Sequence, residues 1–467
     1  MFRPSLLLLL SFLLFAACRS STGGEETTTG AGEAAPDAAD FRSWTPTPPM
    51  GWNSWDSYGP TVREDEVRAN ADYMAAELAD YGWEYVVVDI RWFVENTKRH
   101  GYNQTDPIYV LDDYGRYLPA TNRFPSAADG NGFTALADYV HGKGLKFGIH
   151  IMRGVPVEAV ERKLPVLGAE GVTADMIYSP EEQCKWLRDN YTVVAGRPGA
   201  QEYYNSIMDL YASWGVDFIK IDDLSAPIYH KDEIEMIRRA IDQTGRPMVL
   251  STSPGPTPVE YADHVSRHAN MWRMVNDVWD NWPDVDNLLT VTEGWYDYVG
   301  DGTWPDCDMI PLGRVSVRGE RGDDRMADLS HDEQYSLMNL FTIFRSPLMF
   351  GGDLPSNDAF TLSLLTNTDV LRMHRESRDV RLLSEAGDAV AITSRHPAEG
   401  WTYLALFNRG EEADTRVEAD LAALGLTGRV RVTDLWTGEA VGEYEGTFAR
   451  SFAPHASGLY RLEPAAR

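Results

Sequence analysis

The fold is decided by Trp214-Gly215-Val216-Asp217-Phe218-Ile219-Lys220-Ile221-Asp222-Asp223. Residues 200–214 have the apolar spacing of a helix, which Gly215 is placed to end. Residues 218–221 are a short apolar run, and such a run between helices is typical of a strand in a parallel sheet. The run ends in two acids, where parallel α/β folds place their active sites. The alternative is that these acids only cap the next helix.

Apolar runs and helical patterns alternate on both sides of this stretch. After a first strand and turn at 48–55, strands are expected at 85–92, 145–151, 218–222, 248–253, 271–275, 308–311 and 346–350. Helices are expected at 63–81, 133–143, 202–214, 231–243 and 332–344. Eight strands alternating with helices predict a (β/α)₈ TIM barrel, over residues 42–378.

Polar or aromatic residues stand at the ends of six of these strands. They are Trp55, Asp89, His150, Asp222, Ser253 and Asp308. Because the carboxyl ends of barrel strands meet at one face, we expect these side chains to converge on one mouth. Residues 154–199 are long for a loop and are expected to fold over that mouth.

The two ends of the chain differ from this central part. Residues 1–18 read as a lipoprotein signal peptide, with an apolar stretch at 6–15 and small residues before Cys18, the expected lipidation site; ordinary signal cleavage near Ala17 is the alternative. Residues 19–41 are rich in Gly, Thr, Ala and Glu and are expected to be a flexible tether. Residues 379–467 carry short strand patterns without a long helix, which predicts an antiparallel β-sandwich.

Composition narrows the range of partners. The net charge of −29 argues against nucleic acid, because a phosphate backbone requires clustered Lys and Arg. Besides Cys18 only Cys184 and Cys307 remain, which make neither a disulfide framework nor a metal-ligand set. We expect an exported, membrane-anchored protein of the bacterial cell envelope, in the periplasm or on the cell surface. The membrane contact is expected only through the N-terminal lipid, and the sequence leaves the oligomeric state open.

A second group of acids lies in Trp272-Arg273-Met274-Val275-Asn276-Asp277-Val278-Trp279-Asp280-Asn281-Trp282, at and beyond the sixth strand. Acids at the ends of strands four and six, with tryptophans nearby, suit glycoside hydrolysis, which needs one carboxylate at the anomeric carbon and one carboxyl to protonate the leaving oxygen. The alternative for Arg273 and Asp277 is an ordinary surface ion pair, and Asp280 competes with Asp277 for the role. We expect at least one of the three tryptophans to contact sugar; barrel packing is the alternative.

Several ordered motifs resemble those of glycoside hydrolase family 27, the α-galactosidase and α-N-acetylgalactosaminidase group. They are Pro48-Pro49-Met50-Gly51-Trp52-Asn53-Ser54-Trp55, Tyr81-Gly82-Trp83-Glu84-Tyr85, Gly144-Leu145-Lys146-Phe147-Gly148-Ile149, Trp214-Gly215-Val216-Asp217, Trp304-Pro305-Asp306-Cys307-Asp308-Met309 and Ser346-Pro347-Leu348-Met349. The resemblance implies a barrel with a C-terminal β-domain, and a retaining mechanism without metal or organic cofactor. It implies Asp222 as nucleophile and Asp277 as general acid/base.

Other site residues follow from the same resemblance and from the strand ends. Trp55, Asp89, Lys220 and Arg273 match sugar-contacting positions, and Asp308 matches an acid near the catalytic pair. His150, Ser253 and Asp223 are further candidates for substrate binding. For His150 we favour a hydrogen-bonded wall residue over an acid/base role. Asp223 is either a helix cap or a ligand-binding group.

The chain also departs from the family pattern. Family α-galactosidases commonly have two adjacent acids at the end of the second strand, which help to hold galactose hydroxyls, whereas here Asp89 is followed by Ile90. The small Ser253 leaves room for a different substituent at the 2-position. The main expectation is a retaining α-galactosidase acting on oligo- or polysaccharides. The alternatives are isomalto-dextranase, β-L-arabinopyranosidase or α-N-acetylgalactosaminidase activity, or a non-catalytic glycan-binding lipoprotein.

Overall fold

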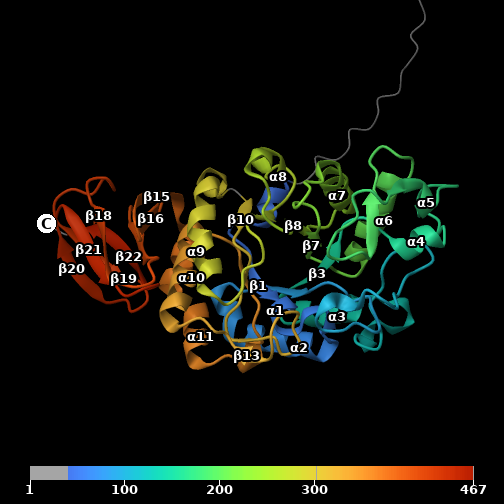
Figure 1. Ribbon diagram of the computed structural model, residues 1–467, viewed down its shortest axis with the longest axis horizontal. Coiled ribbons are helices and arrows are strands. Elements are labelled where there is room, and N and C mark those ends of the chain that lie inside the picture. The colour runs from blue at the N-terminus through green and yellow to red at the C-terminus, as the bar shows by residue number, and fades with distance from the viewer. Residues whose placement is uncertain (1–39, 301, 466–467) are drawn as a thin grey trace, which may run out of the picture. The chain divides into compact units, whose positions relative to one another are not determined.

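The computed structural model describes residues 40–300 and 302–465 (Figure 1). The expected signal peptide, its lipidation site Cys18 and nearly all of the expected tether lie outside these residues. Within the described ranges, no helix is both long enough and apolar enough to cross a bilayer.

The described chain is built around one parallel sheet. Its order is β10 (Trp304–Asp306), β9 (Met271–Arg273), β8 (Val249–Thr252), β7 (Phe218–Asp222), β3 (Lys146–Met152), β2 (Tyr85–Val88), β1 (Met50–Asn53), β14 (Leu348–Phe350) and β11 (Met309–Ile310). The first and last of these belong to one run, residues 304–310, which pairs with β9 on one side and with β14 on the other. The sheet therefore closes through this run, and the predicted barrel is confirmed.

The seventh strand differs from its prediction. It begins at Trp304 rather than at Asp308, and it is interrupted between Asp306 and Met309. Asp308 there has a φ of 88°, and its backbone N–H donates to Asp306 Oδ1 at 2.9 Å. The interruption takes Asp308 out of the ladder, so that its side chain is free to turn toward the barrel mouth.

Burial on both faces explains why these strands read as continuous apolar runs. In the middle of the sheet, Ile219 pairs with Ile149 on one side and with Leu250 on the other, and all three side chains are fully buried. A strand that is covered on both faces has no polar positions to alternate with. The polar residues of β7 are confined to Lys220 and to Asp222 at its end.

Helices surround this sheet (Figure 1). The longer ones are α2 (Glu64–Tyr73), α3 (Thr134–His141), α6 (Ala200–Ser213), α7 (Lys231–Thr244), α9 (Trp282–Val291), α10 (His331–Phe344), α11 (Ala359–Leu365) and α12 (Thr368–Glu376). As expected, Gly215 follows the end of α6 with a φ of 84°, a conformation that glycine adopts without strain. The helix expected at 63–81 is α-helical only to Tyr73 and continues as a π-helical turn (η3, Met74–Leu78) and a 3₁₀ turn (η4, Ala79–Tyr81).

The segment 154–199 is more structured than a loop. It contains β4 (Val155–Pro156), α4 (Val157–Glu161), α5 (Ala174–Ile177), β5 (Tyr178–Ser179) and β6 (Asn190–Val193), and the three strands form a small antiparallel sheet in the order β4-β6-β5. A buried ion pair, Arg91 Nε to Asp189 Oδ2 at 3.0 Å, joins it to the end of β2. The segment brings Trp186 to the barrel mouth, as expected of a cover.

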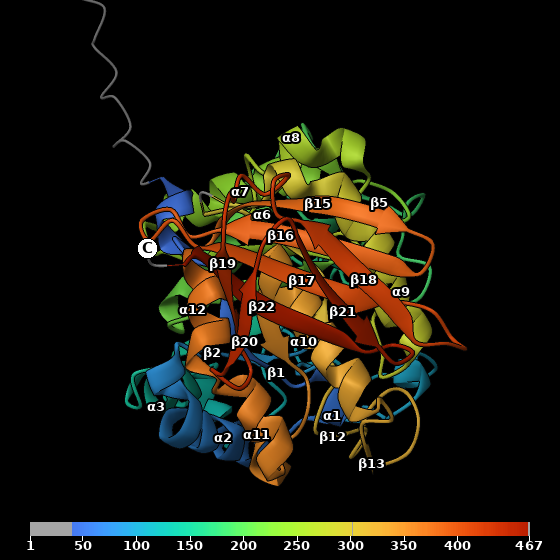
Figure 2. The same cartoon turned by 90° about the vertical axis from the view of Figure 1, so that its left-hand side faces the viewer.

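The C-terminal part is the predicted antiparallel sandwich (Figure 2). One sheet has the order β15 (Arg378–Ala386), β16 (Ala389–Arg395), β17 (Thr402–Asn408), β22 (Ser457–Pro464), β19 (Val430–Asp434) and β20 (Ala440–Tyr444), and the other pairs β18 (Thr415–Asp420) with β21 (Thr447–Phe452). Along β17, Leu404 and Leu406 pack inside the sandwich, whereas Ala405 and Phe407 pack in the barrel's core. The large sheet therefore packs against the barrel on one face and against the small sheet on the other.

Candidate active site

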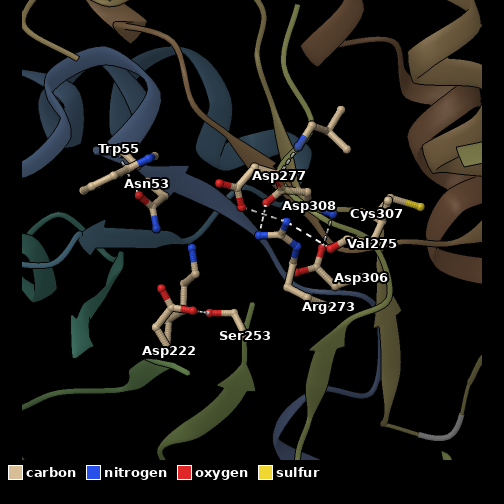
Figure 3. Close-up of polar contacts among 12 residues, drawn as sticks. Asn53, Trp55, Asp222, Ser253, Arg273, Val275, Asp277, Asp306, Cys307 and Asp308 are labelled. Atoms are coloured by element: carbon tan, nitrogen blue, oxygen red, sulfur yellow. Dashed lines mark hydrogen bonds and ion pairs between the residues drawn. The ribbon is translucent and has the colours of Figure 1, made fainter. Parts of the chain in front are cut away.

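A cavity of about 870 Å³ opens at the carboxyl ends of the barrel strands. Its lining includes Trp55, Asp89, His150, Lys220, Asp222, Ser253, Arg273, Asp277 and Asp308. Every candidate site residue from the sequence therefore lies on this one cavity, except Asp223 and the lipidation site Cys18. Asp222 faces the cavity from the end of β7, and Asp277 faces it from the connection that follows β9 (Figure 3). The convergence expected from the strand ends is confirmed.

Asp222 lies at the end of β7 with a side chain that is 12% exposed. Ser253 Oγ donates a hydrogen bond to its Oδ1 at 2.9 Å, and His150 Nε2 lies 3.7 Å from its Oδ2 (Figure 3 shows the serine contact). Burial raises the pKa of Asp222, and the charges of His150 and Lys220 offset part of that rise. The carboxylate is thus held in one orientation with its oxygens toward the cavity.

Asp89, at the end of β2, is fully enclosed beneath this carboxylate. Its Oδ1 lies 2.7 Å from His150 Nδ1, and its Oδ2 lies 3.8 Å from Lys220 Nζ. Burial alone would raise the pKa of Asp89, but these two partners hold it below its ordinary value. His150 is therefore a wall residue fixed by a carboxylate, as favoured from the sequence, and it presents its other nitrogen to Asp222.

The opposite side of the cavity is organised by Arg273, at the end of β9. Its NH1 lies 2.6 Å from Asp308 Oδ1, and its NH2 donates to Asp277 Oδ1 at 3.2 Å. The backbone N–H of Val278 donates to Asp308 Oδ2 at 2.7 Å. The Arg273 side chain is 3% exposed and that of Asp277 is 49% exposed, so the alternative of an ordinary surface ion pair is wrong for the arginine.

Asp277 and Asp308 share this guanidinium and repel each other. Burial raises the pKa of Asp308 to about 7, which Arg273 offsets only in part and Asp277 reinforces. Burial also opposes ionisation of Asp277, but Arg273 and Lys220 outweigh it and the pKa of Asp277 lies below its ordinary value. Asp308 therefore titrates near neutral pH, whereas the more exposed Asp277 is ionised while the cavity holds only water.

Asp223 lies elsewhere, which corrects its assignment as a substrate-binding candidate. Its φ is 63°, and this left-handed turn directs the side chain away from the cavity to Arg153 NH2 at 2.9 Å. Arg153 in turn lies 2.7 Å from Glu233 Oε1. Burial raises the pKa of Asp223 to about 7 despite the arginine. Asp223 does not cap a helix either, because the N-cap of α7 is His230.

Asp280 and two of the tryptophans belong to the scaffold. Asp280 accepts from Arg325 NH2 at 2.5 Å and Nε at 3.0 Å, which leaves Asp277 as the acid of this motif that lines the cavity. Trp272 is fully buried, and Trp282 stacks on His455 with ring centroids 4.1 Å apart. Only Trp279 of the three lines the cavity, and His455 is an interdomain contact as well as a turn residue.

Sequence reasoning missed several cavity residues. Tyr102 stacks on Trp55 with centroids 5.6 Å apart, and Trp186, Glu320 and Arg321 also reach the cavity; the last two lie between β12 (Arg314–Val315) and β13 (Arg325–Met326). These residues come from connections that have no periodic pattern. A further omission is Asp56, directly after Trp55, whose pKa is raised well above its ordinary value by burial and then by Asp308.

The donor set of the cavity suits a neutral polyol more than a metal ion. Lys220 and Arg273 stand among the acids, with Lys220 Nζ 3.8 Å from Asp89 Oδ2 and Arg273 NH1 2.6 Å from Asp308 Oδ1, and these two positive charges would repel a metal ion. Among residues 40–300 and 302–465, three ligand groups close enough for a metal ion gather only at Glu235, His264 and His268, which do not line this cavity. What the cavity can do chemically is offer one oriented carboxylate, a second carboxyl open to solvent, and aromatic faces for a sugar ring.

Comparison with known proteins gives a consistent result. Residues 47–159 and 187–376 match the family model described as Alpha galactosidase A, and residues 387–462 match the Alpha galactosidase C-terminal beta sandwich domain. The gap between the first two ranges falls in the segment that covers the mouth. Residues 160–186, inside this segment, are therefore the longest stretch of the barrel and the sandwich that the two family models do not match.

Individual relatives carry different activity names. A β-L-arabinopyranosidase of Geobacillus stearothermophilus, solved with arabinose, is 47% identical, with a TM-score of 0.89 over 91% of this chain and 99% of that one. A Bacillus halodurans protein described as a candidate α-N-acetylgalactosaminidase is 44% identical, with a TM-score of 0.81 over 90% of this chain and 98% of that one. The rice α-galactosidase is 26% identical over 425 residues, which cover 90% of this chain and 85% of that protein.

Proposed function

The chain belongs to glycoside hydrolase family 27, the α-galactosidase family of retaining glycosidases, and we propose that its own reaction is the hydrolysis of terminal β-L-arabinopyranosides. This replaces the galactoside that the sequence favoured with one of the alternatives. The two sugars have the same ring hydroxyl arrangement, and α-D-galactopyranose differs by the hydroxymethyl group on C5. Specificity between them therefore depends on the cavity wall that this group would meet.

Ile90 is the observation that carries the proposal. It follows Asp89 at the mouth of β2, it lines the cavity, and it is 2% exposed. It packs in an apolar cluster with Met152, Cys184 and Leu187. An apolar side chain here offers no hydrogen-bond partner to a hydroxymethyl group, and burying that hydroxyl unpaired costs about 1–3 kcal/mol. A pentopyranose has only a CH₂ at this position and loses nothing.

The roles of the two acids are part of the proposal. Asp222 attacks the anomeric carbon and forms the glycosyl-enzyme intermediate, and Asp277 protonates the leaving oxygen and then activates water. Because Asp277 is ionised in the water-filled cavity, it takes up a proton from solvent before it protonates the leaving oxygen, and the loss of its hydration when substrate binds favours that uptake. The leaving group displaces water from the exposed side of Asp277, and Asp308, which shares Arg273 with it, is a neighbouring carboxyl whose pKa is raised to about 7.

Lys220, Asp89 and Arg273 bind the sugar hydroxyls in this proposal, and Trp55 and Trp279 stack on apolar faces of the ring. All five line the cavity. Deglycosylation, the hydrolysis of the glycosyl-enzyme intermediate, needs a water molecule beside Asp277. The Asp277 side chain is open to solvent.

The test compares two aryl glycosides that share a leaving group, the β-L-arabinopyranoside and the α-D-galactopyranoside. We expect kcat/KM to favour the arabinoside by about 10-fold or more, the cost of one buried unpaired hydroxyl. Ile90→Asp, which supplies an acceptor, should reverse or abolish the preference. Ile108→Asp is the matched control, because Ile108 is 52% exposed and lies outside the cavity lining. If the wild-type protein prefers the galactoside, the proposal is wrong and α-galactosidase is the better assignment.

The α-N-acetylgalactosaminidase activity is supported by one observation of its own. Ser253 is the small side chain on the cavity wall beside Asp222, and its hydroxyl is engaged with that carboxylate. An aryl α-N-acetylgalactosaminide added to the same panel separates this activity, since the 2-acetamido group requires space beside Ser253. Turnover of that substrate above the other two would replace the proposal.

A further inference from the structure

Two histidines and a glutamate meet on the outer side of the barrel, away from the substrate cavity. Glu235 lies in α7, His264 lies in α8 (Ala262–Val265), and His268 lies one turn after it. His264 Nε2 is 3.3 Å from Glu235 Oε1, and one ligand atom from each of the three residues lies within 4.8 Å of the others. The two imidazole rings stack with centroids 4.2 Å apart. From this convergence we propose that the three side chains bind one divalent transition-metal ion of the Zn²⁺ class.

The second nitrogen of each histidine already has an oxygen partner. His268 Nδ1 lies 2.7 Å from the carbonyl oxygen of His264, and because a carbonyl only accepts, this nitrogen carries the proton. Its Nε2 is therefore unprotonated and has a lone pair that can bind a metal ion. His264 Nδ1 lies 2.6 Å from the Tyr229 hydroxyl, whose oxygen can accept a hydrogen bond from Nδ1–H and so leave Nε2 to the metal. Histidines that ligate metals are held in this way by a hydrogen bond from the other ring nitrogen.

The glutamate is also arranged for the role. Its Oε2 lies 3.5 Å from Arg239 NH1, which leaves Oε1 directed at His264. The side chain of His264 is 10% exposed and that of Glu235 is 32% exposed, so the site is sheltered on one side and open to an entering ion on the other. Two imidazoles with one carboxylate match the ligand preference of Zn²⁺ and its neighbours, whereas Mg²⁺ and Ca²⁺ prefer oxygen alone.

A bound ion would join α7 to α8 and the residues just after it, and each of these helices follows a connection that forms part of the cavity wall. The β7–α7 connection contributes Ser225, Ala226 and Pro227 to the cavity lining, and the β8–α8 connection contributes Pro254, Gly255, Pro256 and Pro258. Tyr229 and Tyr261, one from each connection, already stack with centroids 4.2 Å apart. The ion therefore has a structural role: it joins the helices that follow these two connections.

The test uses the full chain without a histidine tag, stripped with EDTA and desalted. Titration calorimetry with Zn²⁺ should show one saturable site per chain, and Zn²⁺ at about 100-fold excess over its Kd should raise Tm by about 2 °C or more. The Co²⁺-loaded protein should show visible absorption bands of a low-coordinate site. Mg²⁺ at the same concentration should leave Tm unchanged.

His268→Phe keeps an aromatic ring beside His264 but has no ligand nitrogen, and Glu235→Gln keeps the shape of the carboxylate. Both variants should lose the Zn²⁺ titration, the Tm rise and the Co²⁺ bands. His331→Gln, at an exposed histidine on α10, should behave as the parent. Either of the two site variants suffices if the other does not fold. Absence of a stoichiometric Zn²⁺ site in the parent, or an unchanged site in a folded variant, would overturn the proposal.

Discussion

The two sides of the cavity hold their carboxylates by different means. Asp222 ends a buried strand, is 12% exposed, and has a serine, a histidine and a lysine around it. Asp277 stands in the connection after β9, is 49% exposed, and depends on Arg273. A group that must attack one atom benefits from a rigid strand end, whereas a group that meets a leaving group and then water needs an open side. The two side chains are of the same type, so their environments are what distinguish the two roles that we propose for them.

The largest effect is expected on the strand side. Asp222→Asn removes the attacking oxygen and keeps the hydrogen bond from Ser253 possible, so kcat should fall by about 10⁴-fold or more. The measurement is steady-state hydrolysis of the aryl arabinoside, with Tm to show that the fold is kept. Retention of more than a hundredth of the parent activity would mean that another group attacks.

The effect of Asp277→Asn should depend on the leaving group of the substrate. General acid catalysis contributes about 10²- to 10⁴-fold, and an aryl group that leaves without a proton does not need it. We therefore expect a large loss on natural oligosaccharides and a smaller loss in the first step on activated aryl glycosides. Added azide should restore turnover of the aryl substrate, because a small anion can replace water on this open side. Equal losses on both substrate types would remove Asp277 from the role.

Lys220→Met tests the surroundings of Asp222 through the pH dependence of kcat/KM. The lysine charge lowers the pKa of Asp222, so its loss should raise that pKa further. Because only the ionised carboxylate attacks, the acidic limb of the kcat/KM profile should move to higher pH, and kcat/KM at its optimum should fall by about 10- to 100-fold through the lost sugar contact. A profile with an unmoved acidic limb would show that Lys220 does not act on Asp222.

The smallest effect is expected at Ser253. Ser253→Ala removes one hydrogen bond to Asp222, worth about 1 kcal/mol, so kcat/KM should fall by about 5-fold. Ser225→Ala is the matched control, because Ser225 lines the same cavity but its hydroxyl has no hydrogen-bond partner among the described residues. Identical kinetics for the two variants would show that the serine contact does not orient the nucleophile.

The sequence predicted the strand side of this comparison better than the loop side. Parallel strands bring their carboxyl ends to one face, so Asp89, His150 and Asp222 could be placed together from the order of the strands alone. One residue further, the prediction failed for Asp223, because a left-handed φ of 63° turned its side chain to Arg153. That backbone conformation is uncommon for aspartate and leaves no periodic signal.

Connections were predicted least well. Tyr102 and Trp186 reach the cavity from segments whose course depends on tertiary contacts, such as the Arg91–Asp189 ion pair, rather than on local pattern. The interrupted seventh strand is similar, because the apolar run at 308–311 concealed the turn at Asp308. In both cases a long-range contact, and not residue preference, decides where the side chain points.

The most direct test of the two-sided account is to locate the covalent intermediate. Asp277→Asn, mixed with an aryl β-L-arabinopyranoside that carries a good leaving group, should accumulate the glycosyl-enzyme, because formation needs no acid and hydrolysis lacks its base. Peptide mapping by mass spectrometry is predicted to find the pentosyl mass on Asp222 of the peptide that contains it. A pentosyl group on Asp308 or Asp56, or a burst without any covalent adduct, would contradict the account.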